Sequence, residues 1–325
     1  MSNALLKVEN LKVYFPSPAP GGLRRRYVPL KAVDDVSFTV AEGETVGIVG
    51  ESGCGKSTLA RAILQLIETT GGRIVWQGED LTRLGRKAMN EKRRDLGVVF
   101  QDPLSSLNPR MTIGSIIAEP LRRFHPEMSR EDINTAVVET MRDVGLNREH
   151  LNRYPHEFSG GQCQRVSIAR AMILRPKLVI CDEPVSALDV STRTQTINLL
   201  KELQRKHRIS IIFISHDLSV VRIVCTRIIV MYLGHFVETA DRDTLFGSPT
   251  HPYTRALLSA IPVPDLQSQD DARRVILKGE LPSPTEPPSG CVFRTRCPIA
   301  TNYCIKREPI LQPRENGARV ACHHV

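Results

Sequence analysis

The sequence has no uninterrupted apolar run long enough to cross a bilayer. Its longest apolar-rich region, residues 211–234, is broken by His216, Asp217, Arg222 and Arg227, whereas a spanning helix needs about 20 consecutive, predominantly apolar residues. The N-terminus also lacks a positively charged segment followed by an apolar stretch, which would mark a secretory signal. These absences exclude a membrane-spanning chain and predict the cytosol as its compartment.

The sequence also lacks a long block of one charge. Its formal net charge of +9 would suit nucleic acid or a position beside anionic lipid. Lysine and arginine are scattered, however, with only short clusters at residues 24–26 and 92–94. We therefore expect a solvated surface, or one that lies near a membrane, and no nucleic-acid partner.

The chain is organised around residues 50–57, Gly-Glu-Ser-Gly-Cys-Gly-Lys-Ser, which match the pattern G-x-x-x-x-G-K-S/T at each defined position. Its glycines let backbone N–H groups turn inward around phosphates, its lysine can reach the β- and γ-phosphates, and its last serine can ligate Mg²⁺. A strand is expected over 45–49 and a helix over 58–67, in the order that such a site requires. The sequence therefore predicts a nucleotide site made of Gly50, Glu51, Ser52, Gly53, Cys54, Gly55, Lys56, Ser57 and Thr58.

The residues before this phosphate loop are rich in strand patterns, at 6–13 and 31–40. Proline, glycine and arginine over 16–26 predict an exposed loop between them. An aromatic side chain in this region could stack on the nucleotide base, although packing in the core is the alternative for each candidate. Phe15 is the preferred candidate, and Tyr14 and Tyr27 come behind it.

Further strands are expected over 71–78 and 96–100, and Gln101 leaves the second of them. The carboxyl end of a strand is where an α/β fold places ligand contacts. Residues 102–158 change to helical patterns. Ser129 and Asp132 resemble a capping box at the start of one helix, which we expect to end at Gly145.

A second anion site is expected at Ser159, Gly160, Gly161 and Gln162. These residues open a helix that should run to about residue 174. Free backbone N–H groups and the positive end of the helix dipole favour an anion at such a helix start. The chain therefore carries two phosphate-binding devices.

Two acids follow the buried apolar pattern of residues 178–181. In enzymes with a phosphate loop, an aspartate at the end of such a strand holds Mg²⁺, which assigns Asp182. The next carboxylate, Glu183, is then placed to orient or deprotonate the attacking water. A further buried strand over 210–215 leads to His216, which could sense the γ-phosphate.

Together these motifs resemble the nucleotide-binding subunits of ABC transporters over roughly residues 5–265. The resemblance makes Gln101 the Q-loop, residues 159–162 the signature, Asp182 with Glu183 the Walker B pair, residues 186–189 the D-loop and His216 the switch histidine. Cys163 follows the signature. At this position the oligopeptide and dipeptide branch of importer ATPases commonly has a basic residue. By this resemblance Ser57, Gln101 and Asp182 are the Mg²⁺ ligands, and Glu183, His216 and Gln101 are the catalytic residues.

The resemblance implies an α/β fold of the P-loop NTPase class, with a RecA-like core, an antiparallel β subdomain and a helical subdomain. We expect the nucleotide-binding domain over residues 1–240, its helical subdomain at about 102–175, and a small irregular extension over 241–325. In this family two such domains pair head to tail, so that each ATP lies between one phosphate loop and the other signature. A second ATPase subunit is therefore required, and we expect a heterodimer.

Residues 251–262 look like the C-terminal box of the oligopeptide and dipeptide branch of importer ATPases, and residues 280–284 and 290–291 are similar to that branch too. The resemblance implies a peptide importer subunit at the cytoplasmic face of the membrane, with two permease subunits and an external substrate-binding protein as further partners. ATPases of nickel and glutathione importers are similar. A soluble ABC ATPase is disfavoured because sustained heptads and a second set of motifs are absent. An isolated P-loop kinase or GTPase would leave the signature unexplained.

Four of the eight cysteines lie after residue 290, at Cys291, Cys297, Cys304 and Cys322. Four thiolates suit a 4Fe–4S cluster or Zn²⁺, and the absence of tight C-x₂₋₄-C pairs favours the iron–sulfur cluster over zinc. Members of the resembled branch carry such a cluster. Four reduced cysteines in a proline-rich segment are the alternative, and the cytosol disfavours disulfides. A metal centre would be the main internal cross-link of a segment with little regular structure.

Overall fold

The computed structural model describes residues 4–18, 27–261, 277 and 279–325. The chain divides into two compact units, and each is built from segments that are distant in the sequence. The first, called here the helical unit, contains Val40–Thr45 and Arg83–Ile214. The second, the phosphate-loop unit, contains Ala4–Thr39, Val46–Thr82 and Ser215–Val325. The domain boundary near residue 240 stays a prediction.

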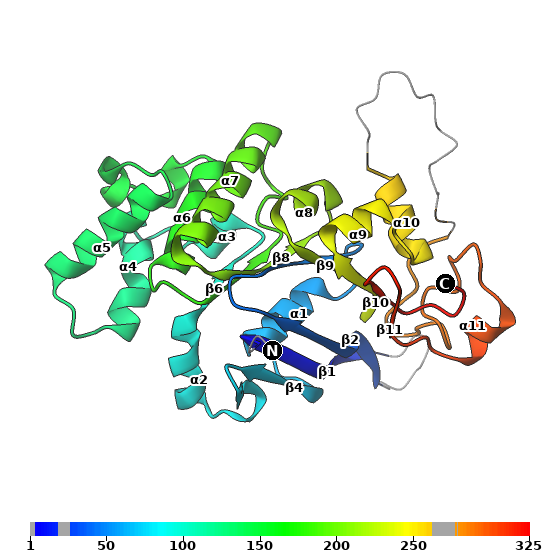
Figure 1. Cartoon of the computed structure of the whole chain (residues 1–325). Coiled ribbons are helices and arrows are strands. Elements are labelled where there is room, and N and C mark those ends of the chain that lie inside the picture. Colours follow the sequence, from blue (N-terminus) through cyan, green and yellow to red (C-terminus); the bar gives the residue numbers. More distant parts are fainter. Residues whose placement is uncertain (1–3, 19–26, 262–276, 278) are drawn as a thin grey trace, which may run out of the picture. The chain divides into compact units, whose positions relative to one another are not determined.

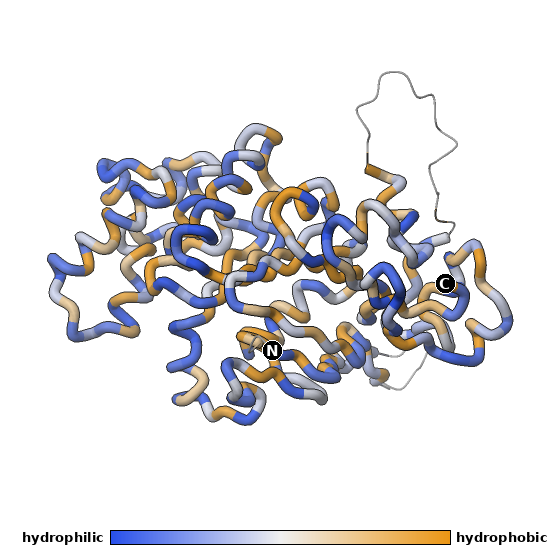
Figure 2. Tube along the Cα trace, in the orientation of Figure 1, coloured by the Kyte–Doolittle hydropathy of each residue, from blue (hydrophilic) through white to orange (hydrophobic). Residues whose placement is uncertain are grey.

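Parallel strands form the centre of the helical unit. Strand β7 (Leu178–Asp182) lies between β6 (Leu96–Val99) and β8 (Ser210–Ser215). Every residue of β7 and β8 is buried, as expected for parallel strands covered on both faces, and Figure 2 colours much of this region as hydrophobic. These strands begin where the sequence predicts them, and their carboxyl ends carry Gln101 and Glu183.

Helices pack around these strands, and α4, α5 and α6 lie together (Figure 1). A polar side chain starts each of them: Thr112, Ser129 and Ser159 accept a hydrogen bond from a backbone N–H of the first turn. The helical pattern predicted over 102–158 is therefore confirmed. The helices of this unit are α2 (Arg86–Lys92), η2 (Arg93–Asp95), α3 (Pro103–Ser106), α4 (Ile113–Phe124), α5 (Arg130–Asp143), η3 (Arg148–Asn152), η4 (Pro155–Glu157), α6 (Gly160–Met172) and α7 (Val190–His207).

An antiparallel sheet forms one part of the phosphate-loop unit, in the order β2-β1-β4-β5. The predicted exposed loop is too long at its start, because β1 continues through Phe15 to Pro18 and leaves both Pro16 and Pro18 exposed. Proline is tolerated at such exposed strand positions, and residues 19–26 lie outside the described part. The strands are β1 (Leu6–Pro18), β2 (Tyr27–Val40), β4 (Gly71–Trp76) and β5 (Glu79–Asp80), and η1 (Leu81–Arg83) follows them.

A second set of strands in this unit begins with β3 (Thr45–Val49), which is fully buried and pairs in parallel with β9 (Arg227–Tyr232). Strand β10 (His235–Asp241) pairs antiparallel with β9. The C-terminal segment then adds β12 (Arg319–Val320) to β10 and β11 (Gln312–Pro313) to β12. The helices of this unit are α1 (Lys56–Ile63), α8 (Leu218–Val224), α9 (Arg242–Gly247), α10 (Pro252–Ser259) and α11 (Asn302–Lys306).

Two sequence-based expectations need correction here. Helix α1 begins at Lys56 rather than residue 58, and it ends at Ile63 because Gln65 turns out of the helix at a φ of 51°. The C-terminal segment has more regular structure than its prolines suggest. Strand β12 pairs with β10, β11 pairs with β12, and Phe293 is 1% exposed, so strand pairing and apolar burial help to hold this segment.

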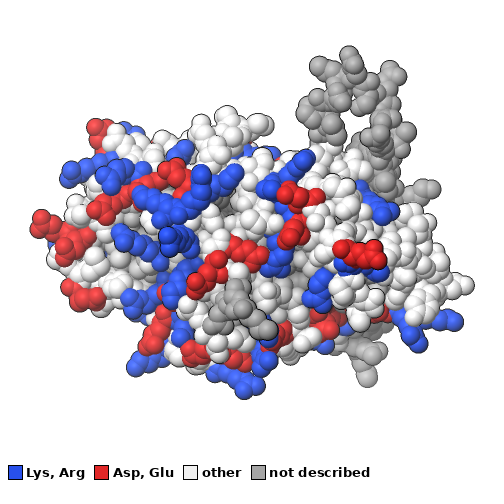
Figure 3. Space-filling model, in the orientation of Figure 1, with Lys and Arg blue, Asp and Glu red and all other residues white. Residues whose placement is uncertain are grey.

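The surface and the helices agree with the composition. Within the part of the chain that the structure describes, no helix combines the length and apolar character that crossing a bilayer needs. On the face seen in Figure 3, basic and acidic side chains are interspersed. On this face the two charges are mixed (Figure 3), as the scattered lysines and arginines of the sequence predict.

Candidate functional site

The phosphate loop, residues 50–57, connects β3 to α1 in the order that the sequence predicts. Gly55 has a φ of 107° and a Cβ there would lie 2.0 Å from the carbonyl oxygen of Ala32. A Cβ at Gly50 would lie 2.1 Å from the carbonyl oxygen of Met231. Because neighbouring backbone leaves no room for a side chain, both positions require glycine. The exposed pair Ser52 and Gly53 forms the outer turn of the loop.

Lys56 is held inside this loop. Its Nζ donates to the carbonyl oxygens of Gly50 at 2.8 Å and Glu51 at 2.9 Å, and the residue is 5% exposed. Cys54 is buried beside it, and burial raises the pKa of its thiol, so this cysteine acts as a small apolar residue. The ammonium group is thus held in place by backbone carbonyl groups of the phosphate loop itself. Ser57 and Thr58 are half-buried in the first turn of α1.

The three candidate base-stacking aromatics differ in their surroundings. Phe15 on β1 is 39% exposed and Tyr27 is 58% exposed. The Tyr14 hydroxyl instead donates to Asp34, and its ring lies under the Lys31 ammonium. Tyr14 therefore has a structural role, and Phe15 stays the first candidate for a base.

Gln101 and Glu183 are brought together at the carboxyl ends of β6 and β7. The amide nitrogen Nε2 of Gln101 donates to Glu183 Oε2 at 3.0 Å. Glu183 is 9% exposed and has a φ of 48°, a left-handed conformation that is uncommon for a residue other than glycine. The backbone N–H of Glu183 donates to the carbonyl oxygen of Ile214, which fixes this turn. Asp182, the last residue of β7, is 6% exposed.

His216 follows β8 at its carboxyl end and is exposed. The next residue, Asp217, caps α8 by accepting from the backbone N–H of Ser219 at 2.9 Å. His216 therefore lies in the connection between β8 and α8, directly after the carboxyl end of the strand, where the sequence predicts it.

The signature, residues 159–162, forms a capping box at the start of α6. The Ser159 hydroxyl accepts from the Gln162 N–H, and the Gln162 side chain accepts from the Ser159 N–H at 3.0 Å. A Cβ at Gly161 would lie 2.3 Å from Thr192 Cγ2 of α7, whereas a Cβ at Gly160 would meet nothing within 4 Å. Gly161 is thus needed for packing inside this chain, and Gly160 is not. The departure from the family pattern, Cys163, is fully buried.

The D-loop, residues 186–189, ends in the cap of α7. Asp189 accepts from the N–H and the hydroxyl of Thr192, both at 2.9 Å, and from the Ser191 hydroxyl at 2.7 Å. The Thr192 backbone N–H contributes most to lowering the pKa of this carboxyl to about 2. Since Thr192 also contacts Gly161, the D-loop and the signature share one anchor residue.

The four C-terminal cysteines lie in the phosphate-loop unit. Cys291 and Cys304 are buried, whereas Cys297 and Cys322 are half-buried. Burial, and to a smaller extent the charges of the other three thiols, raise the pKa of Cys291 to about 11. Cys304 Sγ lies 3.3 Å from Nε2 of His324. Across the described ranges, however, no three His, Cys, Asp or Glu side chains are grouped closely enough to hold a metal ion.

Sequence reasoning missed two side chains that contact the phosphate loop. The Tyr253 hydroxyl accepts from the backbone N–H of Glu51 at 2.9 Å. Nη1 of Arg296 donates to Glu51 Oε1 at 3.0 Å and to Oε2 at 2.9 Å. Arg296 lies among the C-terminal cysteines in the sequence, and the structure pairs it with Glu51. Nothing in the local pattern around either residue indicates a contact so distant in the sequence.

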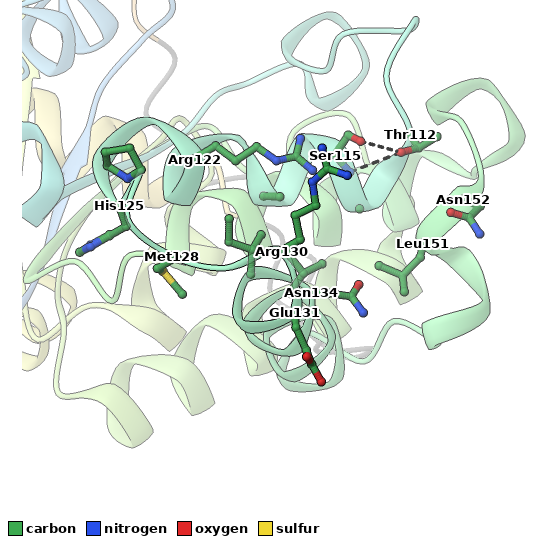
Figure 4. Close-up of a pocket in the computed structure, with 15 residues that line it drawn as sticks. Thr112, Ser115, Arg122, His125, Met128, Arg130, Glu131, Asn134, Leu151 and Asn152 are labelled. Atoms are coloured by element: carbon green, nitrogen blue, oxygen red, sulfur yellow. Dashed lines mark hydrogen bonds between the residues drawn. The ribbon is translucent and has the colours of Figure 1, made fainter.

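The helical unit also contains a hollow of about 910 Å³ between α4, α5 and η3 (Figure 4). Thr112, Ser115, Arg122, His125 and Arg130 contribute polar atoms to it, and Thr112 and Ser115 are hydrogen-bonded to each other. None of the predicted site residues lines this hollow, so it is separate from the nucleotide motifs.

Comparison with known proteins agrees with these motifs. The family profile described as ABC transporter matches residues 33–186, and the one described as oligopeptide/dipeptide transporter, C-terminal region, matches residues 237–304. The oligopeptide transport ATP-binding protein OppF of Salmonella typhimurium is 55% identical over 95% of this chain and 92% of its own length. AppF of Bacillus subtilis, with the same description, is 48% identical over 98% and 97%.

Solved structures agree as well. CbiO1 of Clostridium perfringens, described as part of an ABC transporter complex, is 26% identical with a TM-score of 0.65 over 76% of this chain and 92% of its own. The ATP-binding cassette MJ0796, described as a dimer in a post-hydrolysis state with ADP and Pi, is 30% identical with a TM-score of 0.64 over 73% and 98%. The chain therefore belongs to the family of ABC transporter ATP-binding proteins. Its predicted α/β fold of the P-loop NTPase class and its activity as an ATPase are confirmed.

Proposed function

We propose that this chain is the ATP-hydrolysing subunit of a membrane importer whose cargo is dipeptides or oligopeptides. The observation that carries the proposal is the match of residues 237–304 to the C-terminal region of oligopeptide/dipeptide transporters. OppF and AppF, which are similar along almost the whole chain, are described as oligopeptide transport ATP-binding proteins. We also propose the division into a nucleotide-binding domain over residues 1–240 and an extension over 241–325.

The proposed chemistry assigns a role to each motif. The loop amides of residues 50–57 and the Lys56 ammonium bind the phosphates, with the start of α1 at Ser57 and Thr58 behind them. Phe15 stacks on the base. Glu183 accepts a proton from the attacking water, and the 3.0 Å contact with Gln101 holds its carboxylate in one orientation. His216 positions that water near the γ-phosphate.

Magnesium fits the donor atoms that the chain offers. A hydroxyl at Ser57, a carboxylate at Asp182 and an amide oxygen at Gln101 are the hard oxygen ligands that Mg²⁺ prefers. Because the amide nitrogen of Gln101 donates to Glu183, its amide oxygen is the atom left to meet a cation. When bound, Mg²⁺ offsets charge on the phosphates.

The signature serves the ATP of a second subunit in this proposal. Ser159 and Gly160 are exposed, and the open space around Gly160 leaves room for a ligand that this chain does not supply. The start of α6 provides N–H groups and the positive dipole end for phosphate. We propose a heterodimer with a similar ATPase, two membrane-spanning permease subunits reached through the Q-loop at Gln101, and an external substrate-binding protein. The chain would then lie peripherally on the cytoplasmic face of the membrane.

The first prediction tests cargo and assembly together. The chain co-purified with its permease subunits and second ATPase, in proteoliposomes containing the substrate-binding protein, should hydrolyse ATP faster when oligopeptides are added. Peptide binding outside is expected to bias closure of the ATPase pair. Stimulation is measured as the increase in the rate of phosphate release. It is compared between oligopeptides, nickel and glutathione, each offered as the cargo. Stimulation by either competitor and not by peptides would contradict the peptide assignment, and failure to co-purify with any membrane subunit would favour a soluble ATPase.

For the C-terminal cysteines we propose a 4Fe–4S cluster, with Zn²⁺ as the alternative. The support is chemical: the other three thiols lie near enough to Cys291 for their charges to raise its pKa. Because the described sulfurs are not arranged as a ligand set, loading would have to draw them together. The pairing of β12 with β10 and the burial of Phe293 also anchor this segment.

The second prediction tests this cluster. Protein purified anaerobically should be brown, absorb broadly near 400 nm and contain about four irons per chain. Replacing Cys297 and Cys304 by serine should remove the iron, whereas replacing the buried Cys225, which lies beside Gly47, should not. Colourless protein with stoichiometric zinc, with reduced thiols only, or with iron that persists in the double variant would contradict the assignment.

A further inference from the structure

Glu51, the second residue of the phosphate loop, is contacted by the C-terminal extension. Arg296 Nη1 lies 3.0 and 2.9 Å from the two carboxylate oxygens of Glu51. The Arg296 side chain is 9% exposed and that of Glu51 is 28% exposed, so this ion pair is largely shielded from water. Shielding strengthens the attraction and makes the loss of one partner costly.

The same residue is held through its backbone. Its N–H donates to the Tyr253 hydroxyl at 2.9 Å, and its carbonyl oxygen accepts from Lys56 Nζ at 2.9 Å. The Lys56 ammonium is therefore positioned partly by Glu51. Any shift of this residue would move both the first turn of the loop and the lysine that reaches the phosphates.

The groups that hold Glu51 are themselves rigidly packed. The Tyr253 ring is fully buried and lies 4.7 Å from Tyr232 and 5.4 Å from Phe293, measured between ring centroids. The Arg296 guanidinium lies 6.0 Å from the centre of the Tyr232 ring. The Arg296 N–H donates to the carbonyl oxygen of Phe293 at 3.0 Å. The extension thus presents Arg296 from a turn that is anchored by a buried aromatic cluster.

The ion pair between Arg296 and Glu51 also changes the charge of the phosphate loop. A carboxylate in a loop that binds an anionic triphosphate disfavours the ligand, because like charges repel at short range. Pairing with Arg296 neutralises the Glu51 charge locally. Without the arginine, the loop would carry an uncompensated anion beside the phosphates.

We propose that Arg296 is a positioning residue for the phosphate loop, through which the C-terminal extension sets the affinity for MgATP. The proposal rests on the proposed assignment of residues 50–57 as the ATP-binding loop. Arg296 acts through Glu51, both by fixing the first turn of the loop and by neutralising its carboxylate.

The third prediction tests this role by equilibrium titration of the full-length chain with a fluorescent ATP analogue and Mg²⁺. Arg296→Ala should raise the dissociation constant by between roughly threefold and thirtyfold, the range typical of residues that act on a site indirectly. Arg296→Lys, which keeps the charge but not the planar fork, should recover part of the loss. Arg319→Ala removes an arginine of the same extension whose guanidinium donates to Leu311, and it should leave binding unchanged.

A double-mutant cycle separates positioning from a general effect on folding. If Arg296 acts through Glu51, then Arg296→Ala should have little further effect in the Glu51→Gln background, because the carboxylate to be neutralised is gone. An equal loss of affinity in both backgrounds, or no loss in either, would overturn the proposal. A wild-type chain that binds no MgATP would overturn the ATP-binding loop itself, whereas normal wild-type binding with an unchanged Arg296→Ala would overturn only the role of Arg296.

Discussion

Replacing Glu183 by glutamine is expected to slow ATP hydrolysis by roughly 10²- to 10⁴-fold while MgATP still binds. The glutamine keeps the size of the side chain, and its amide oxygen can still accept the hydrogen bond from Gln101 Nε2 that the carboxylate accepts at 3.0 Å. What is lost is the carboxylate that we propose as the acceptor of a proton from the attacking water. Phosphate release by the assembled complex measures the rate, and equilibrium titration measures the affinity.

Two other variants serve as comparisons for Glu183→Gln. Glu202 lies exposed on α7 in the same unit, so Glu202→Gln makes the same chemical change away from the site and should hydrolyse ATP normally. Lys56→Ala should instead weaken nucleotide binding, because it removes the ammonium that we propose binds the phosphates. Unchanged hydrolysis in Glu183→Gln, or a loss that is entirely a loss of binding, would refute Glu183 as the base.

The backbone at Glu183 shows what sequence reasoning could not supply. An apolar run followed by two acids predicts the end of β7 correctly, because a buried parallel strand has a distinctive composition. The φ of 48° at Glu183 has no such local signal. It accompanies the hydrogen bond from the Glu183 N–H to Ile214 on β8, a partner that depends on the tertiary fold. Strained residues of this kind often occur at functional positions.

Helix starts were predictable for the opposite reason, since the partners of a cap lie within one turn. Ser129 and Ser159 begin α5 and α6 as their patterns predict. The α1 boundary was missed by two residues because the left-handed conformation of Gly55 lets the helix begin at Lys56. Local chemistry thus predicts where most elements start, and glycine geometry shifts the boundary.

The C-terminal extension was the least predictable part. Its prolines suggested an irregular segment with a metal centre as its main internal cross-link, yet Phe293, Val320 and the pairing of β12 with β10 also anchor it. These contacts join residues that are far apart in the sequence, so composition alone cannot reveal them. The contact between Arg296 and Glu51 belongs to the same class.

Introducing an aspartate at Gly160 is expected to reduce hydrolysis at the ATP site that this signature completes by about a hundredfold. A carboxylate at ~6 Å from a phosphate charge, with an effective dielectric constant of ~20, costs about 2 to 3 kcal/mol per unit charge. The folded chain should tolerate the substitution, because a Cβ at Gly160 meets nothing within 4 Å. Gly161 would be a poor choice, since its Cβ would collide with Thr192.

The control for this variant is Gly247→Asp. Gly247 is also exposed, and a Cβ there also meets nothing within 4 Å. The same charge is therefore added at a position outside the signature. The isolated wild-type chain provides the second measurement. Because we propose that its signature serves the ATP of another subunit, it should hydrolyse ATP slowly at high dilution and faster once the cognate subunits are added. Full activity in Gly160→Asp would show that this signature takes no part in hydrolysis, and a dilute chain that matches the complex per active site would show that each chain completes its own site. Either result would contradict the head-to-tail pairing.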